Sequence, residues 1–182
     1  EIIPDRIEAG TFLMAGALLG EIEVKNIIPK HLDKVVHKLR ETGCILKINQ
    51  NSIIITPPEK IKSVDMTTAV YPGFPTDLQA QWVAIMSLAD GSSVVTDTVY
   101  HDRFSHIPEL SRLGANIKVE NNTAFIRGKN TLVGAPVMST DIRASASLII
   151  AALAAKGETQ ISRVYHIDRG YENIEQKFEG LG

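Results

Sequence analysis

An aspartate at the start of a rigid turn is the first candidate for chemistry. Tyr71 to Gln81 reads Tyr-Pro-Gly-Phe-Pro-Thr-Asp-Leu-Gln-Ala-Gln, in which two prolines and a glycine turn the backbone. Thr76 is expected to cap the helix that follows, with Gln79 completing a capping box. Asp77 then lies in the first helical turn, where the helix dipole favours an ionised carboxylate. A carboxylate held in this way suits a general base or a ligand contact, although it could also serve only to start the helix.

Arginines occur at corresponding points of two later stretches. Arg103 lies in Tyr-His-Asp-Arg-Phe, and Arg169 lies in the near copy Tyr-His-Ile-Asp-Arg-Gly. Asp141 and Arg143 open a further apolar run at a point equivalent to that of Asp77. Arginine forks near helix N-termini suit phosphate and carboxylate recognition, whereas local ion pairs that only orient loops are the plain alternative. Repeat geometry is expected to bring all of these side chains to one end of the domain.

A repeated unit must position these side chains. Three apolar helical runs end at Gly20, Gly91 and Gly157, and each is followed by a short strand and a more polar helix. Two hairpins then match without a gap, at residues 45–56 and 116–127, and each roughly alternates apolar and polar positions. The remaining predicted strands cover residues 22–24, 65–69, 93–98 and 159–164, and the polar helices cover 29–41, 107–113 and 171–179. The unit is therefore helix, strand, helix and hairpin, with another strand before the first helix.

The first helix of each unit is apolar almost all round. Residues 10–19, 79–89 and 145–155 are too few to span a membrane, so these helices are expected to be buried on all sides at the centre. The hairpins, with one polar face each, are expected outside them. The predicted fold class is α/β, an inside-out, barrel-like domain of three repeats with central buried helices and outer sheets.

The 182 residues are interpreted as a single domain, 1–182, with repeats at about 4–60, 65–130 and 135–182. The last repeat stops where its hairpin should begin, and the first begins almost at its helix. Strands from outside the chain are therefore expected to complete the three units. On this hypothesis the chain is one part of a larger protein.

Composition excludes several classes of function. The net charge is −2 with mixed signs, which argues against a nucleic-acid partner or a polybasic membrane contact. The single cysteine, Cys44, rules out an internal disulfide and suits a reducing cytoplasm, and no apolar run is long enough to cross a membrane. There is no metal-ligand spacing, no P-loop and no dinucleotide motif, so neither a metal nor a cofactor is expected.

Four motifs resemble one known family. They are Pro-Thr-Asp-Leu-Gln-Ala-Gln at 75–81, Ser-Thr-Asp-Ile-Arg-Ala-Ser-Ala-Ser-Leu at 139–148, Tyr-His-Ile-Asp-Arg-Gly-Tyr-Glu at 165–172 and the opening residues 4–12. Together they resemble the UDP-N-acetylglucosamine 1-carboxyvinyltransferases of the enolpyruvyl transferase family, along essentially the whole chain. The resemblance implies an enzyme of two inside-out α/β domains that close over their substrates, with this chain as one of the two.

The resemblance also implies a reaction. The enolpyruvyl group of phosphoenolpyruvate would pass to the 3′-hydroxyl of UDP-N-acetylglucosamine, with release of phosphate. This is the first committed step of peptidoglycan synthesis in the cytoplasm, on which cell shape, cell cycle and cell division depend. Asp77 matches the proposed base beside the 3′-hydroxyl, and Val99 matches a further sugar-nucleotide contact.

The same resemblance assigns the charged residues of the later motifs. Arg103 and Arg169 match arginines at the phosphoenolpyruvate end, so Arg169 joins Asp77 as an expected catalytic residue. Asp141 and Arg143 match a pair that lines the cleft between the two domains.

The chain also departs from the family pattern. The other domain of the family supplies a Lys-Asn pair, more arginines and a mobile-loop cysteine or aspartate that donates a proton. Cys44 does not lie in such a loop, so the chain alone is expected to be inactive. Two alternatives stay open, a 3-phosphoshikimate 1-carboxyvinyltransferase-like enzyme and a non-catalytic sugar-nucleotide-binding domain. The intact motif at 75–81 weighs against the first, and the retained Asp77, Arg103 and Arg169 weigh against the second.

Overall fold

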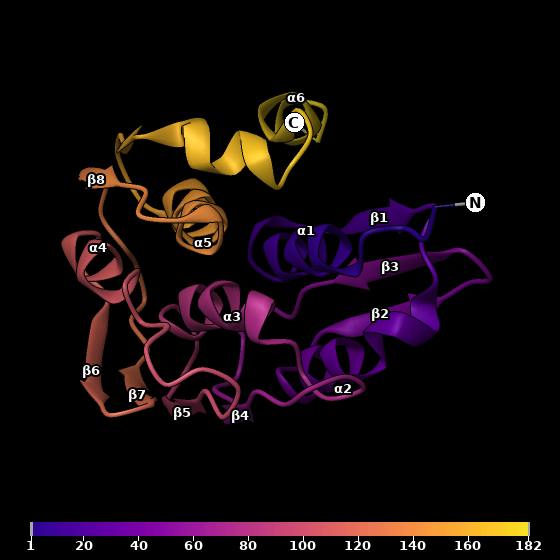
Figure 1. Cartoon of the computed structure of the whole chain (residues 1–182), viewed down its shortest axis with the longest axis horizontal. Helices are drawn as coiled ribbons and strands as arrows, with labels where there is room; N and C mark the ends of the chain where they lie inside the picture. Colours follow the sequence, from indigo (N-terminus) through magenta and orange to yellow (C-terminus); the bar gives the residue numbers. More distant parts are fainter. Residues whose placement is uncertain (1, 182) are drawn as a thin grey trace.

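Three helices occupy the centre of the structure, which is a computed structural model that describes residues 2–181. They are α1 (Arg6–Leu19), α3 (Gln79–Met86) and α5 (Ile142–Ala154), and they pack against one another in the middle of the molecule (Figure 1). Every residue of α3 is buried, and α1 is buried without a break over residues 9–17. The nearly continuous apolar sequence of these helices thus leaves no broad solvent-facing stripe, and their predicted central burial is confirmed.

Three sheets lie outside these helices. The first contains β1 (Ile22–Lys25), β3 (Ser52–Thr56) and β2 (Ile45–Ile48) in that order, all antiparallel. The second contains β4 (Met66–Thr67), β5 (Ser92–Thr96), β7 (Thr123–Arg127) and β6 (Asn116–Glu120), with only β4 and β5 parallel. The third pairs β8 (Pro136–Met138) with β9 (Gln160–Ser162) in parallel. Helices inside and sheets outside are the predicted inside-out α/β arrangement (Figure 1).

Alternation along β7 shows which face of the second sheet is inward. In β7, Ala124 and Ile126 are buried, whereas Phe125 between them is exposed. Successive side chains of a strand point to opposite faces, so this pattern turns one face of the sheet towards the central helices. Both predicted hairpins form, and β6 is one residue longer than expected.

Shorter helices complete the units. They are η1 (Pro29–Leu32) with α2 (Asp33–Glu41), α4 (Ile107–Arg112), η3 (Val164–Arg169) and α6 (Ile174–Glu179). A glycine with a left-handed backbone follows both α2 and α4, with φ of 98° at Gly43 and 93° at Gly114. The two ends make the same pair of backbone hydrogen bonds, a Schellman-type cap. This shared ending supports the proposed correspondence between the first two units.

The third unit departs most from the sequence prediction. Its strand ends at Ser162, because Arg163 adopts a left-handed backbone with φ of 59° and η3 begins directly after it. The predicted helix from Tyr171 begins only at Ile174, because Asn173 is also left-handed, with φ of 50°. The strand predicted at 65–69 is likewise shorter and covers only β4. Within residues 2–181, no helix is both long and apolar enough to cross a membrane.

Candidate functional site

Asp77 lies in a short helical turn directly before a central helix. This turn is η2 (Thr76–Leu78), and α3 follows it without a break. The predicted capping box is wrong, because Pro75 occupies the N-cap position and no side chain caps the turn. The Thr76 hydroxyl donates instead to Oδ2 of Asp97, at 2.5 Å. The hydroxyl is oriented by this strong, charged acceptor, and no backbone N–H group of the turn donates to its oxygen as a cap would require.

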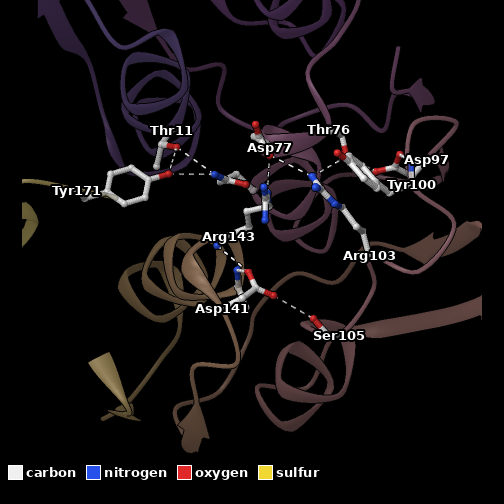
Figure 2. A network of polar contacts seen from close by, with 12 residues as sticks. Thr11, Thr76, Asp77, Asp97, Tyr100, Arg103, Ser105, Asp141, Arg143 and Tyr171 are labelled. Carbon is white, nitrogen blue, oxygen red and sulfur yellow. Dashed lines mark hydrogen bonds and ion pairs between the residues drawn. The ribbon is translucent and has the colours of Figure 1, made fainter. Parts of the chain in front are cut away.

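Two arginines hold the Asp77 carboxylate. Its Oδ1 accepts a hydrogen bond from Nη1 of Arg103 at 3.0 Å and another from Nε of Arg143 at 2.5 Å (Figure 2). Arg143 comes from the first turn of α5, and Arg103 comes from the loop after β5. The structure therefore brings together three predicted site residues that lie up to 66 positions apart in the chain.

The accessibility of these three side chains differs. The Asp77 side chain is 41% exposed, Arg143 is 37% exposed and Arg103 is 19% exposed. In this arrangement Oδ1 of Asp77 is occupied by arginines, whereas no hydrogen bond joins its Oδ2 to the residues described in this structure. The second oxygen is therefore open to a ligand from solvent.

Asp141 has a different role in the structure. It is the N-cap of α5, where its Oδ1 accepts from the backbone N–H groups of Arg143 at 2.8 Å and Ala144 at 3.0 Å. Ser105 donates to its other oxygen at 3.1 Å. Burial raises the pKa of Asp141, but these hydrogen bonds and the Arg143 charge lower it by more, so the pKa lies below its usual value. Asp141 thus fixes the start of the helix that carries Arg143.

Val99 and Arg103 share one loop, whose shape is fixed by Asp97. The backbone N–H groups of Val99 and Tyr100 both donate to Oδ1 of Asp97 at 2.9 Å. The Tyr100 ring then lies against Arg103, with the guanidinium carbon 3.6 Å from the ring centroid. A cation over an aromatic face is attracted by its electron density, so Tyr100 helps to hold the arginine.

Sequence reasoning misses Asp97, although it organises this end of the molecule. It is fully buried and accepts four hydrogen bonds, from the hydroxyls of Thr68 and Thr76 and from the backbone N–H groups of Val99 and Tyr100. Burial raises the pKa of Asp97, but these hydrogen bonds lower it by more, so the net direction is downward. The signal in the sequence is an aspartate directly after β5, at the mouth of a loop.

Arg169 is the predicted residue that the structure leaves apart. It ends η3 and is exposed, and its side chain makes no hydrogen bond or ion pair with any residue in the range 2–181. Its neighbour Gly170 lies against Ile142, where an added Cβ would come within 2.6 Å of the isoleucine Cγ2. Arg169 is thus next to a residue that packs on the start of α5, but it does not reach the Asp77 cluster.

A polar hollow of about 200 Å³ adjoins the arginines. Its lining includes Arg103, Arg143 and Asp141, together with Gln79 and His106. Nε2 of Gln79 and Nε2 of His106 are buried and have no hydrogen-bond partner among the described residues. Burial lowers the pKa of His106 to about 4, so its imidazole is neutral at neutral pH. Arginine forks beside unpaired polar groups suit a small anion.

A second buried network ties the site to the centre of the fold. The Thr11 hydroxyl and the Tyr171 hydroxyl are 2.9 Å apart, and Nε2 of Gln81 donates to both, at 3.1 Å and 3.3 Å (Figure 2). Burial raises the pKa of Tyr171. These residues come from α1, α3 and the segment after η3, so the network joins parts of all three proposed units. No cluster of three or more possible metal ligands occurs within residues 2–181.

Comparisons with known proteins show which sequences the chain is similar to. A sequence model of EPSP synthase (3-phosphoshikimate 1-carboxyvinyltransferase) matches residues 1–178. The UDP-N-acetylglucosamine 1-carboxyvinyltransferases of Myxococcus xanthus and Desulfosudis oleivorans are 50% and 53% identical to all 182 residues. The chain spans only 43% and 44% of these two relatives.

Solved structures show the same fold. The enolpyruvyl transferase NikO from Streptomyces tendae aligns with the whole chain at a TM-score of 0.87 and 28% identity, over 43% of its own length. The EPSP synthase from Acinetobacter baumannii aligns with 88% of the chain at a TM-score of 0.67 and 18% identity, over 39% of its own length. The second likeness is evidence for the fold alone. By its sequence match over residues 1–178, the chain belongs to the EPSP synthase family of enolpyruvyl transferases.

Proposed function

We propose that the protein carrying this chain transfers the enolpyruvyl group of phosphoenolpyruvate to the 3′-hydroxyl of UDP-N-acetylglucosamine. The observation that carries the proposal is the Asp77 carboxylate, held by Arg103 and Arg143 beside a polar hollow. Relatives that are 50–53% identical over the whole chain carry the name of this transferase. The proposal includes two small-molecule substrates and no cofactor. It also includes a second domain, because the relatives are more than twice as long as this chain.

Asp77 is the proposed general base. In this proposal an acid on the second domain protonates the methylene carbon of the enolpyruvyl group, which opens the double bond. The sugar hydroxyl attacks the central carbon, a new C–O bond forms, and the hydroxyl proton must leave. Oδ2 of Asp77 is open, while its Oδ1 is fixed by two arginines, so the carboxylate is positioned to receive that proton. The intermediate then returns the added methylene proton to a group of the protein and expels phosphate, which breaks the C–O bond to the leaving group and restores the double bond. General-base assistance of this kind contributes roughly 10²- to 10⁴-fold to the rate.

The arginines are proposed to bind the anionic substrate. Phosphoenolpyruvate carries a phosphate and a carboxylate, and guanidinium groups pair with both through charge-assisted hydrogen bonds. Arg103 and Arg143 already neutralise one carboxylate, and Arg169 is an exposed cation available from the neighbouring η3. Val99, in the loop that Asp97 fixes, is the proposed sugar-nucleotide contact. Asp141 accepts a hydrogen bond from the backbone N–H of Arg143 at the start of α5, and the pair is proposed to line the cleft between the two domains.

The biological setting is part of the same proposal. The reaction would be the first committed step of peptidoglycan synthesis, with a role in building the cell wall and thus in cell shape, cell cycle and cell division. Both substrates are cytoplasmic metabolites, so we place the protein in the cytoplasm. Neither nucleic acid nor a membrane is a proposed partner, which fits the mixed charge and the net charge of −2.

Phosphate release by the full-length protein that carries this chain tests the proposal. The assay supplies phosphoenolpyruvate with either UDP-N-acetylglucosamine or shikimate 3-phosphate as acceptor. We expect phosphate release when UDP-N-acetylglucosamine is the acceptor and none when shikimate 3-phosphate is the acceptor. Release only with shikimate 3-phosphate would favour the 3-phosphoshikimate enzyme. Calorimetric binding of the sugar nucleotide without any phosphate release would favour a non-catalytic binding domain.

A further inference from the structure

Thr76 lies between two groups of opposite charge. Its hydroxyl oxygen is 2.5 Å from Oδ2 of Asp97 and 3.3 Å from Nη1 of Arg103 (Figure 2). An ionised carboxylate can only accept hydrogen bonds, and a guanidinium can only donate them. The hydroxyl must therefore donate its single proton to Asp97 and turn a lone pair towards Arg103. The direction of donation along this hydrogen-bond chain, Asp97–Thr76–Arg103, is therefore fixed by the chemistry of its two ends.

The acceptor end of this chain cannot rotate. Asp97 is fully buried, and its Oδ1 accepts from the Thr68 hydroxyl at 2.8 Å and from the backbone N–H groups of Val99 and Tyr100 at 2.9 Å. These three donors belong to the β4 end and to the loop after β5. The second carboxylate oxygen is thereby presented to Thr76 in one direction only.

Arg103 depends on this chain for one of its three restraints. The others are the ion pair with Asp77 at 3.0 Å and the Tyr100 ring at 3.6 Å. Tyr100 is 50% exposed, so the ring is a soft support for a long side chain with several free rotamers. The pair with Asp77 weakens as soon as that carboxylate accepts a proton from substrate. The Thr76 hydroxyl takes no part in that proton transfer, so its hydrogen bond with Arg103 does not depend on the protonation of Asp77.

We propose that Thr76 is a positioning residue: its hydroxyl, oriented by Asp97, holds Arg103 towards the substrate anion while Asp77 accepts the sugar proton. This inference rests on the proposed function, since it assigns Arg103 to phosphoenolpyruvate and Asp77 to the sugar hydroxyl. It predicts that loss of the hydroxyl weakens the binding and use of phosphoenolpyruvate and leaves the binding of the sugar nucleotide nearly unchanged. A merely structural role for Thr76 predicts an equal effect on both substrates.

A pair of variants separates the hydroxyl from the shape of the side chain. Thr76→Val keeps the shape and removes the hydroxyl, and Thr76→Ser keeps the hydroxyl and removes a methyl group. In the full-length protein, Thr76→Val is expected to lower kcat/KM for phosphoenolpyruvate roughly 10- to 100-fold, the usual effect of losing a hydrogen bond to a charged group. The KM for UDP-N-acetylglucosamine should change by no more than about twofold, and Thr76→Ser should stay within about threefold of wild type.

A second variant tests the other end of the chain. In Asp97→Asn the amide can donate to Thr76, which would turn the hydroxyl proton towards Arg103. The same selective loss for phosphoenolpyruvate is expected, and this variant decides the matter if Thr76→Val fails to fold. Thermal unfolding of every variant shows which of them are folded.

Calorimetry with inorganic phosphate gives a readout that does not need turnover. Phosphate should bind more weakly to Thr76→Val than to wild type. Thr76→Ser should bind phosphate about as tightly as wild type does. Unchanged kinetics in Thr76→Val, equal losses for both substrates, or equal losses in the Val and Ser variants would each overturn the inference. If wild type releases no phosphate from the two substrates, the proposed function fails and calorimetry alone decides about Thr76. Failure of wild type to bind phosphate would overturn the inference as well.

Discussion

Three aspartates at one end of the molecule have three different environments. Asp97 is fully buried and accepts only from hydroxyls and backbone N–H groups. Asp141 caps α5. Of the three, Asp77 alone forms ion pairs with arginine side chains, and its side chain is 41% exposed with one oxygen open to solvent. These environments suit three different roles: Asp97 fixes a loop, Asp141 caps a helix, and Asp77 can exchange a proton with a ligand.

Removal of Arg169 should affect one substrate more than the other. Arg169→Ala, in the full-length protein, is expected to reduce kcat/KM for phosphoenolpyruvate, because a desolvated charge pair lost from an anion site costs on the order of 2–5 kcal/mol. Sugar-nucleotide binding, measured by calorimetry, should change far less. Arg127→Ala, which removes an exposed arginine from β7, is the control. Unaltered affinity and rate in Arg169→Ala would count against the assignment.

The buried imidazole of His106 predicts a pH dependence of stability. Its pKa is lowered to about 4 in the folded state from an ordinary value of 6.5, because burial disfavours the charged form. Between these values the unfolded chain binds the proton more tightly, so stability is full above about pH 6.5 and falls as the pH drops towards 4. The loss is on the order of 3 kcal/mol.

Denaturant unfolding at pH 7 and pH 4.5 measures this effect. His106→Gln should lose less stability than wild type between the two pH values, because it has no imidazole to protonate. The matched control is His37→Gln, which replaces a histidine whose side chain is 71% exposed. Equal pH dependence in wild type and His106→Gln would show that another group is responsible.

At the scale of elements, close packing of the central helices sets the position of Asp77. Gly10 of α1 lies against Leu78, the residue that follows Asp77 in η2, and an added Cβ would overlap the leucine side chain. Leu78 is itself fully buried. The turn that carries the candidate base therefore rests on the first central helix, at a point where only a glycine leaves room.

Replacement of Gly10 by alanine tests this contact. Gly→Ala in a helix interior normally gains about 1 kcal/mol of stability, whereas overpacking costs about 1–3 kcal/mol. Gly10→Ala is therefore expected to lower the free energy of unfolding. Leu78→Ala in the same chain should remove the overlap, so the double variant should be less destabilised than the sum of the single changes. Additive effects in a double-mutant cycle would contradict the close approach.

Features that a segment determines by itself are predictable from the sequence. The two hairpins and the buried apolar helices belong to this class, and the structure confirms both. The cap at Thr76 is not predictable in this way, because its hydroxyl is taken by a carboxylate 21 positions away. Asp97 is missed for the same reason, since its partners come from the residue after β4, from η2 and from the loop after β5.

At the scale of the whole molecule, the site requires more than one unit. Asp77 and Arg103 come from the second proposed unit, and Arg143 comes from the start of α5 in the third. The Thr11–Gln81–Tyr171 network links the same region to α1. The charged cluster is therefore a product of the tertiary fold. The sequence motifs predict its members, while the roles of those residues and the repeat boundaries stay predictions.

The central claim is that Asp77 is a base, and Asp77→Asn tests it most directly. The amide cannot accept the proton, but it can still hydrogen-bond the sugar hydroxyl. In the full-length protein, steady-state kinetics should show kcat lower by about 10²- to 10⁴-fold, with nearly unchanged calorimetric affinity for UDP-N-acetylglucosamine. Asp102→Asn, which changes an exposed aspartate that lines the hollow beside Arg103 and Arg143, should be close to wild type. A near-normal kcat in Asp77→Asn, or equal losses of rate and binding, would contradict the claim.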